Sequence, residues 1–287
     1  HIKIKGVKII NLGSKIGLSI LDWIGRYSLN LRLINFLFKN RDKFDVFIVH
    51  GIWQFNNLVC RLLLEKNYYV FTQGMLDKYF LKENFLKVLK KKIYWFCVEK
   101  KNLLNAKAIL LSSKKQGNMN ELGFANTHGI KKNVVRFGMV NSKCNKKKCL
   151  NLFYKKYPSL KNKDFYLFLG RYHQKKGLEI LIKAAHLLKK QNININIVCF
   201  GPKNYNNYEE KLLNLIDKFK LKNQILMFDA IYNQEKTGAM LACTASLLPT
   251  LGENFGIALV ESLIRSKPVI TTTKTNIYKE IEKSKAG

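Results

Sequence analysis

Short apolar segments alternate with amphipathic segments along most of this chain, and no other feature limits its fold as strongly. The runs FYLFLG at 165–170, INIVCF at 195–200 and ILMFDA at 225–230 are almost continuously apolar. The segments between them, 177–190 and 208–220, repeat apolar residues at helical spacing. Apolar strands separated by helices are typical of parallel sheets that are buried on both faces. The pattern therefore predicts a doubly wound α/β fold.

The same alternation extends over the rest of the chain. Further strands are expected at 7–12, 46–50, 69–73, 108–113, 134–137, 246–250 and 269–273. A lysine- and asparagine-rich stretch at 141–164 interrupts the series. We therefore expect two Rossmann-like domains, one over residues 1–140 and one over residues 141–287.

Both ends predict a piece of a longer protein. The first forty residues supply one strand-like run and one helix, too little to begin a doubly wound sheet. The last eight residues, EIEKSKAG, finish a helix with no strand after it. The expected first domain therefore lacks its start and the expected second domain lacks its end.

The net charge of +32, from 51 Lys and Arg against 19 Asp and Glu, first suggests an anionic partner. The charge is spread evenly, since residues 1–140 hold 25 basic and 8 acidic residues and residues 141–287 hold 26 and 11. A nucleic-acid-binding surface would gather its bases on one face or element. We therefore expect no nucleic-acid partner, and keep a basic nucleic-acid-binding protein as the alternative from another class.

Cysteine use and hydropathy indicate where such a chain works. Six cysteines are spread over a chain too long for a disulfide scaffold, which predicts reduced thiols in a cytoplasmic protein. No apolar run approaches the roughly 18 residues of a membrane span. Residues 84–104 predict an amphipathic helix with a basic face, which is compatible with a solvated surface or with peripheral contact with an anionic membrane.

Basic residues follow the strand that ends at Gly170. Arg171 comes directly after this glycine, and Lys176 lies at the start of the next helix. Ligands of parallel α/β sheets bind beyond the carboxyl ends of the strands. Because Arg offers a fork of donors and Lys a point charge, the two side chains together suit a diphosphate.

Two glutamates flank an apolar segment in LGENFGIALVE, which follows the strand at 246–250. A helix is expected to begin near residues 254–256, so that its free N–H groups and Gly256 face a ligand. Glu253 and Glu261 would then lie about 12 Å apart along the helix axis. That separation fits the two ends of one elongated ligand better than an acid and base acting on one bond.

In the first half, two neighbouring strands each end in a polar side chain followed by glycine. His50 precedes Gly51, and Gln73 precedes Gly74. We expect the two side chains to face the same edge of the sheet and keep both as candidate catalytic residues. Glu253 is a third candidate, although it suits a hydroxyl acceptor better than a proton shuttle.

The segments FLGRYHQKKG, FGPK, LPTLGENFGIALVESL and SKPVITT, in this order, resemble retaining glycosyltransferases of family four, or glycosyltransferase group 1. Glu253 and Glu261 match the E-x7-E motif of that family. HGIW and QGMLDKY resemble its acceptor-side domain, which is often seen in enzymes of surface-polysaccharide synthesis such as that of lipopolysaccharide. The resemblance implies the GT-B fold, two Rossmann-like domains that face each other across a cleft.

The resemblance also implies roles for individual residues. Arg171 and Lys176, with Gly256, would hold the diphosphate of a nucleotide-sugar donor. Glu253, Asn254 and Phe255 would contact the donor sugar, the latter two through backbone N–H groups. Glu261 would accept hydrogen bonds from the ribose. A GT-B enzyme stabilises the departing diphosphate with bases and a helix dipole, so no metal and no cofactor is expected.

The chain departs from the family at two points. Gln73 stands where the family often has histidine, and glutamine cannot move a proton. The glycine-rich loop near the start of the first domain is absent. The expected activity is transfer of a hexose-like sugar, with retention, to a glycan or lipid-linked acceptor. A nucleotide-sugar epimerase of GT-B shape remains the alternative within the fold.

Overall fold

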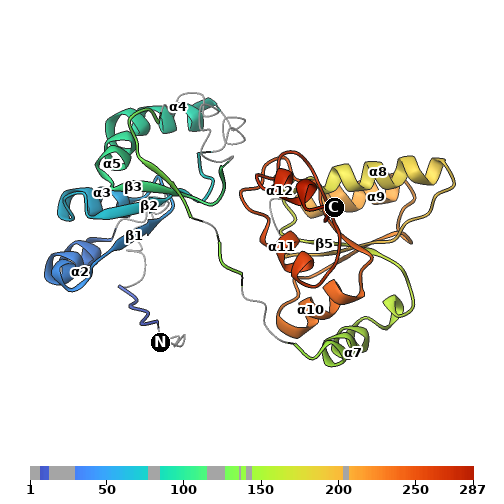
Figure 1. Ribbon diagram of the computed structural model, residues 1–287. Coiled ribbons are helices and arrows are strands. Elements are labelled where there is room, and N and C mark those ends of the chain that lie inside the picture. The colour runs from blue at the N-terminus through green and yellow to red at the C-terminus, as the bar shows by residue number, and fades with distance from the viewer. Residues whose placement is uncertain are drawn as a thin grey trace. The chain divides into compact units, whose positions relative to one another are not determined.

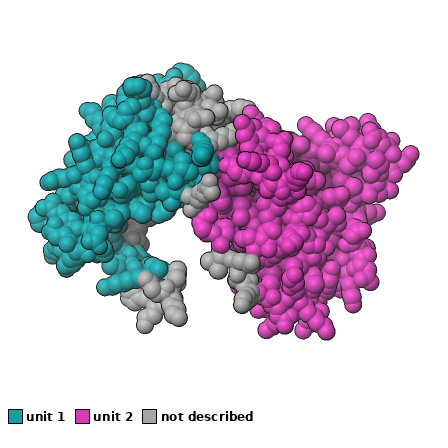
Figure 2. Space-filling view, in the orientation of Figure 1, with its two compact units in different colours: residues 1–136 teal, residues 137–287 magenta. Residues whose placement is uncertain are grey.

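The protein is described from a computed structural model, which covers residues 7–12, 30–76, 85–114, 127–135, 137–139, 144–202 and 207–287. Its contacts divide the chain into two units, residues 1–136 and 137–287 (Figure 2). The lysine- and asparagine-rich stretch at 141–164 predicts a boundary at residue 140, four residues after this division. Each unit is built around its own parallel sheet (Figure 1).

The first unit has a sheet in the order β1-β2-β3-β4. Its strands are β1 (Phe47–His50), β2 (Tyr68–Phe71), β3 (Ala108–Leu111) and β4 (Lys132–Val134). Its helical elements are α2 (Leu31–Asn40), η2 (Arg41–Lys43), α3 (Phe55–Leu63), α4 (Phe85–Tyr94), the π-helix η4 (Trp95–Glu99) and α5 (Lys100–Asn105). All four residues of β3 are buried, which explains why this strand is continuously apolar.

Two predicted strands of the first unit differ from the structure. The strand predicted at 134–137 is observed as β4, whose three residues are all exposed. β4 pairs with β3 through its backbone alone, and its side chains are not buried. Its bounds therefore do not follow from the apolar residues, which lead to a predicted strand that is placed too late. Of the strand predicted at 7–12, only Val7 has bridge geometry and residues 8–12 form neither strand nor helix.

The helix predicted over residues 84–104 is observed as α4, η4 and α5 in direct succession, so a π-helical turn interrupts it. Trp95 and Glu99, at the two ends of that turn, are fully buried. Within the described residues, no helix is both long enough and apolar enough to cross a membrane.

The second unit has five parallel strands in the order β7-β6-β5-β8-β9. The strands are β5 (Tyr166–Leu169), β6 (Ile197–Phe200), β7 (Ile225–Phe228), β8 (Ala245–Leu248) and β9 (Val269–Thr271). The helical elements are α7 (Lys146–Lys156), η6 (Pro158–Leu160), η7 (Gln174–Lys176), α8 (Leu178–Lys190), α9 (Tyr208–Lys218), α10 (Asn233–Ala242), α11 (Ile257–Ile264) and α12 (Tyr278–Lys283).

Both faces of this second sheet are buried. Leu167 of β5 packs in a cluster with Phe153 of α7 and Met240 of α10. Its neighbour Phe168 points the other way, into a cluster with Ile182 of α8 and residues of α9, α11 and α12. Because successive strand residues alternate between faces, helices on both sides are needed to cover β5. The predicted doubly wound α/β fold is confirmed.

Candidate functional site

The strand order of the second sheet reverses between β5 and β8. From β5 the chain proceeds outward through β6 and β7, and it then returns to add β8 and β9 on the other side. Ligands of open parallel sheets bind beyond the carboxyl ends of the strands at such a reversal. The loops after β5 and β8 lie at this point, and they hold Arg171, Lys176 and Glu253.

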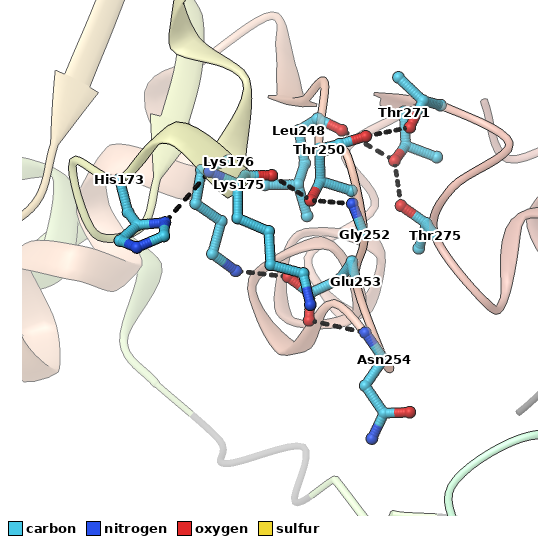
Figure 3. Close-up of polar contacts among 11 residues, drawn as sticks. His173, Lys175, Lys176, Leu248, Thr250, Gly252, Glu253, Asn254, Thr271 and Thr275 are labelled. Atoms are coloured by element: carbon cyan, nitrogen blue, oxygen red, sulfur yellow. Dashed lines mark hydrogen bonds and ion pairs between the residues drawn. The ribbon is translucent and has the colours of Figure 1, made fainter. Parts of the chain in front are cut away.

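These two loops are joined by hydrogen bonds to one backbone carbonyl, that of Lys175. The N–H of Leu251 donates to it at 2.8 Å. The hydroxyl of Thr250 donates to the same oxygen at 2.9 Å (Figure 3). Gly177, with φ +72°, lies so close that a Cβ there would be 2.0 Å from the carbonyl oxygen of Pro249. Only glycine permits both this conformation and this approach. The loop after β5 is therefore held directly against the loop after β8.

Lys176 and Glu253 form an ion pair between the two loops (Figure 3). The ammonium of Lys176 bonds Oε2 of Glu253, and the N–H of Asn254 donates to Oε1 at 3.1 Å. The two side chains are only 21% and 16% exposed. The residues predicted to bind diphosphate and sugar thus lie together and satisfy each other's charge.

The backbone of Glu253 is held as well as its carboxylate. Its N–H donates to the carbonyl of Lys274 at 3.1 Å, and its own carbonyl accepts from the N–H of Asn276 at 2.9 Å. These bonds tie it to the loop after β9. Glu253 is therefore placed by three loops, which leaves its side chain little freedom of direction.

Helix α11 begins at Ile257, slightly later than the predicted start at residues 254–256. Gly256 is its N-cap and has φ +75°. Glu253 lies in the loop before the helix, so the predicted spacing of the two glutamates along one axis does not apply. The side chain of Phe255 packs against the hydrophobic core, with its ring 5.2 Å from that of Phe137. Only the backbone of Phe255 therefore remains for a ligand.

Glu261, on α11, has a partner that the sequence did not reveal. Lys236 of α10 places its ammonium 2.7 Å from one oxygen of the carboxylate and 2.9 Å from the other. Lys236 lies 25 positions earlier in the chain, in a helix of ordinary composition. No pattern in the sequence could have identified it, because only the packing of α10 beside α11 brings it to Glu261.

The loop after β5 is strongly electropositive. Burial lowers the pKa of His173, and the charges of Arg171, Lys175 and Lys176 lower it further. Nδ1 of His173 accepts from the N–H of Lys175 at 3.1 Å, which requires this nitrogen to be unprotonated. Arg171 itself is exposed. The three positive charges of this loop, beside a neutral imidazole, suit the binding of an anionic ligand such as a diphosphate.

In the first unit, the predicted pair of His50 and Gln73 is observed. Nε2 of Gln73 lies 3.1 Å from Nδ1 of His50, and both side chains are exposed. Two residues at this site have a strained backbone. Gln73 itself has φ +51°, and Trp53, in the loop after β1, has φ +67°. Such values in non-glycine residues cluster at functional sites, where surrounding structure maintains them.

A buried carboxyl group supports the loop after β1, and sequence reasoning missed it. Glu99 of η4 accepts from Nδ2 of Asn57 at 3.1 Å and from the N–H of Trp53. The same amide of Asn57 donates to the carbonyl of Gly51 at 3.1 Å. Burial raises the pKa of Glu99 to about 7. The polar group thus holds the segment directly after His50.

The prediction that no metal takes part stays a prediction. Among the residues that the structure describes, no group of three or more His, Cys, Asp or Glu side chains lies together as a metal site would require.

Part of the chain is similar in sequence to known glycosyltransferases. An uncharacterized glycosyltransferase of Methanocaldococcus jannaschii is 30% identical over 112 residues, which are 38% of this chain and 28% of that protein. WcaL of Salmonella typhimurium, whose name refers to a colanic acid biosynthesis glycosyltransferase, is 28% identical over 127 residues, which are 42% of this chain and 30% of WcaL.

The fold is also similar to that of a solved structure. HepE of Anabaena, crystallised with UDP and glucose, is similar with a TM-score of 0.67 and 15% identity, over 86% of this chain and 64% of HepE. This similarity, with two parallel α/β units, identifies the GT-B fold. The matched stretches span less than a third of the length of the two relatives above. Residues 152–287, most of the second unit, match the family described as "Glycosyl transferases group 1".

Proposed function

We propose that the protein transfers a hexose-like sugar from a nucleotide-sugar donor to a hydroxyl of a glycan or lipid-linked acceptor, with retention and without a metal. The observation that carries the proposal is the ion pair of Lys176 and Glu253 at the strand-order reversal. WcaL, which is similar to this chain over 127 residues, is named for colanic acid biosynthesis. We therefore propose that the reaction belongs to surface-polysaccharide synthesis.

The donor would occupy the loops after β5 and β8. Lys176 and Arg171 would bind its diphosphate, and the N-terminus of α11 at Gly256 would add a favourable dipole. Glu253, released from part of its pairing with Lys176, would accept from hydroxyls of the sugar. The negative charge that develops on the leaving diphosphate would thus meet donors already in place.

The remaining predicted residues complete the donor and acceptor contacts. Backbone N–H groups at Asn254 and Phe255 would face the sugar, and Glu261 would accept from the ribose. His50 and Gln73 of the first unit would contact the acceptor hydroxyl. Gln73 would do so by hydrogen bonding alone, because an amide does not transfer protons at neutral pH.

Donor-dependent transfer by the complete protein tests this assignment. UDP-glucose is the first donor to try, because the similar HepE was crystallised with UDP and glucose. We expect Arg171→Ala, Lys176→Ala and Glu261→Ala each to lower kcat/KM for the donor by about 100-fold. Lys211→Ala is the control, since this lysine is 58% exposed and pairs with Glu179 of helix α8.

Three variants with wild-type turnover at low donor concentration would show that the site is assigned wrongly. Incubation of the donor without acceptor separates the rival activity within the fold. An epimerase would change the configuration of the sugar in that incubation, whereas a transferase would leave it unchanged.

We also propose that the protein is cytoplasmic and that α4 brings it into peripheral contact with an anionic membrane. Phe85, Leu89, Ile93 and Phe96 are spaced along one side of α4 and η4 and are between 42% and 76% exposed. Lysines 87, 90 and 92 are exposed beside them. An apolar stripe flanked by lysines suits the interface of an anionic bilayer.

Flotation with liposomes tests the membrane proposal. We expect the wild type to float with vesicles that contain phosphatidylglycerol and to stay behind with purely zwitterionic vesicles. Phe85→Ser with Phe96→Ser should abolish flotation without changing transfer to a soluble acceptor. Equal recovery of wild type and double variant with the anionic vesicles would contradict it.

A further inference from the structure

Lys236 has no role in the proposed reaction, yet it holds one of the two glutamates that do. Its ammonium lies 2.7 and 2.9 Å from the two carboxylate oxygens of Glu261. The side chains of Lys236 and Glu261 are 30% and 19% exposed. The exposed pair of Lys156 and Glu235, by contrast, shows one contact at 2.7 Å with side chains that are 52% and 35% exposed.

The backbone that carries Lys236 cannot shift easily. The next three residues of α10, Thr237, Gly238 and Ala239, are buried. At Gly238 a Cβ would lie 2.3 Å from the carbonyl oxygen of Cys149, so α10 and α7 are in direct backbone contact. Lys236 therefore extends from a fixed point toward α11.

A second tie reinforces the first. Arg265, which caps the C-terminus of α11, donates from Nη1 to the carbonyl of Glu261 at 2.8 Å. Its Nη2 donates to the hydroxyl of Thr237 at 3.1 Å. The main chain and the side chain of Glu261 are thus both held to adjacent residues of α10, which fixes the direction of the carboxylate.

A carboxylate held in this way has a defined remaining capacity. Its two oxygens offer about four lone-pair directions in total. Lys236 uses one direction at each oxygen, so each oxygen can still accept one more hydrogen bond. Two acceptors side by side match a pair of neighbouring hydroxyls, as on carbons 2 and 3 of a ribose.

We propose that Lys236 is a positioning residue that aims Glu261 at the ribose diol and makes the site prefer ribonucleotides to 2′-deoxyribonucleotides. The inference rests on the proposed function, in which Glu261 faces the donor ribose. A 2′-deoxyribose would leave one oxygen of the fixed carboxylate without its second partner, and unpaired polar groups discriminate strongly against such analogues.

Calorimetric binding of nucleoside diphosphates to the full chain tests the proposal. UDP, GDP and ADP are each compared with the 2′-deoxy form. We expect the wild type to prefer the ribose form by about 10-fold, the value of one hydrogen bond to a charged group. Lys236→Met should lose most of this preference by weakening the ribose form alone, and Lys236→Arg should restore part of it. In steady-state transfer, Lys236→Met should raise KM for the donor and leave kcat nearly unchanged.

Lys156→Met is the matched control, because it removes a Lys–Glu pair from the same helix α10 at Glu235. A Lys236→Met variant that weakens ribose and deoxyribose forms equally would overturn the inference, since Lys236 would then only clamp two helices. Tighter binding by this variant would also overturn it, because Lys236 would then compete with the ribose. If the wild type binds none of the three nucleotides, the proposed function itself fails.

Discussion

The two units support their strand-end loops in different ways. In the second unit the loops after β5 and β8 meet at a reversal of strand order, and the partly buried pair of Lys176 and Glu253 joins them. In the first unit the described strands run in chain order, and an exposed contact joins His50 to Gln73. The firm support of the first unit lies deeper, at the buried Glu99.

This difference indicates which loops are suited to bind a charged ligand. In a partly buried ion pair, the ammonium can bind an anionic ligand and the carboxylate can accept from hydroxyls of that ligand. The site already stabilises both charges. An exposed hydrogen bond contributes little on its own and suits contact with a neutral hydroxyl. The donor side of the proposed reaction thus depends on electrostatics, and the acceptor side depends on the shape of a strained loop.

The largest expected effect comes from separating the two loops of the second unit. Gly177→Ala would place a Cβ 2.0 Å from the carbonyl oxygen of Pro249, at φ +72°. We expect the free energy of unfolding to fall by about 4 kcal/mol, from the forced backbone shift and the left-handed conformation. Urea unfolding measures it. Gly138→Ala is the control, since nothing lies within 4 Å of its Cβ position. Equal losses in both variants would refute the close contact.

The buried support of the first unit should show itself in pH dependence. The pKa of Glu99 is about 7 in the folded protein against an ordinary value of 4.5, because burial disfavours the charged form. The folded state therefore binds the proton more tightly, and its stability falls as pH rises from about 4.5 to about 7. We expect this loss to reach about 3 kcal/mol.

Glu99→Gln isolates that contribution, because the amide does not titrate. The difference in unfolding free energy between wild type and variant, from urea unfolding at pH 5 and pH 8, should shift in favour of the variant at pH 8. Arg61, whose charge lowers the pKa of Glu99, stays in place in both proteins. A difference that is the same at both pH values would show that Glu99 does not change its ionisation on folding.

The charged support of the second unit should matter to activity more than to stability. Glu253→Gln keeps the shape of the side chain but removes the charge that pairs with Lys176. We expect kcat/KM for the donor to fall by about 100-fold. Glu179→Gln, which disrupts the more exposed pair with Lys211, should leave transfer unchanged. Wild-type transfer by Glu253→Gln would show that activity does not depend on the ion pair of the second unit.

The exposed pair of the first unit should give the smallest effect. Gln73→Ala removes the hydrogen bond to His50 at 3.1 Å. We expect an increase in KM for the acceptor of about 10-fold or less, and a change in stability under about 1 kcal/mol. For stability, His50→Ala with Gln73→Ala should be little worse than either single change, because each change removes the same hydrogen bond between the two side chains. A loss as large as that of Glu253→Gln would place the chemistry in the first unit instead.

Periodicity in the sequence predicted most of the fold. The apolar runs at 165–170, 195–200 and 225–230 correspond to β5, β6 and β7, because buried parallel strands must be apolar on both faces. The exposed strand β4 was predicted at 134–137 and lies at Lys132–Val134, because backbone pairing leaves no hydropathy signal. The π-helical turn η4 left none either, since its residues continue the helical pattern.

What the sequence determined by itself was the alternation of strands and helices and the residues that follow each strand. The sequence predicts four site residues because ligands of parallel sheets bind beyond the strand ends: Lys176, Glu253, His50 and Gln73. The tertiary structure alone decided which of these residues meet, and it alone brought Lys236 to Glu261 and Glu99 to Trp53. The physical reason is that ion pairs and buried hydrogen bonds depend on distance in space, and helix packing sets that distance without any trace in local composition.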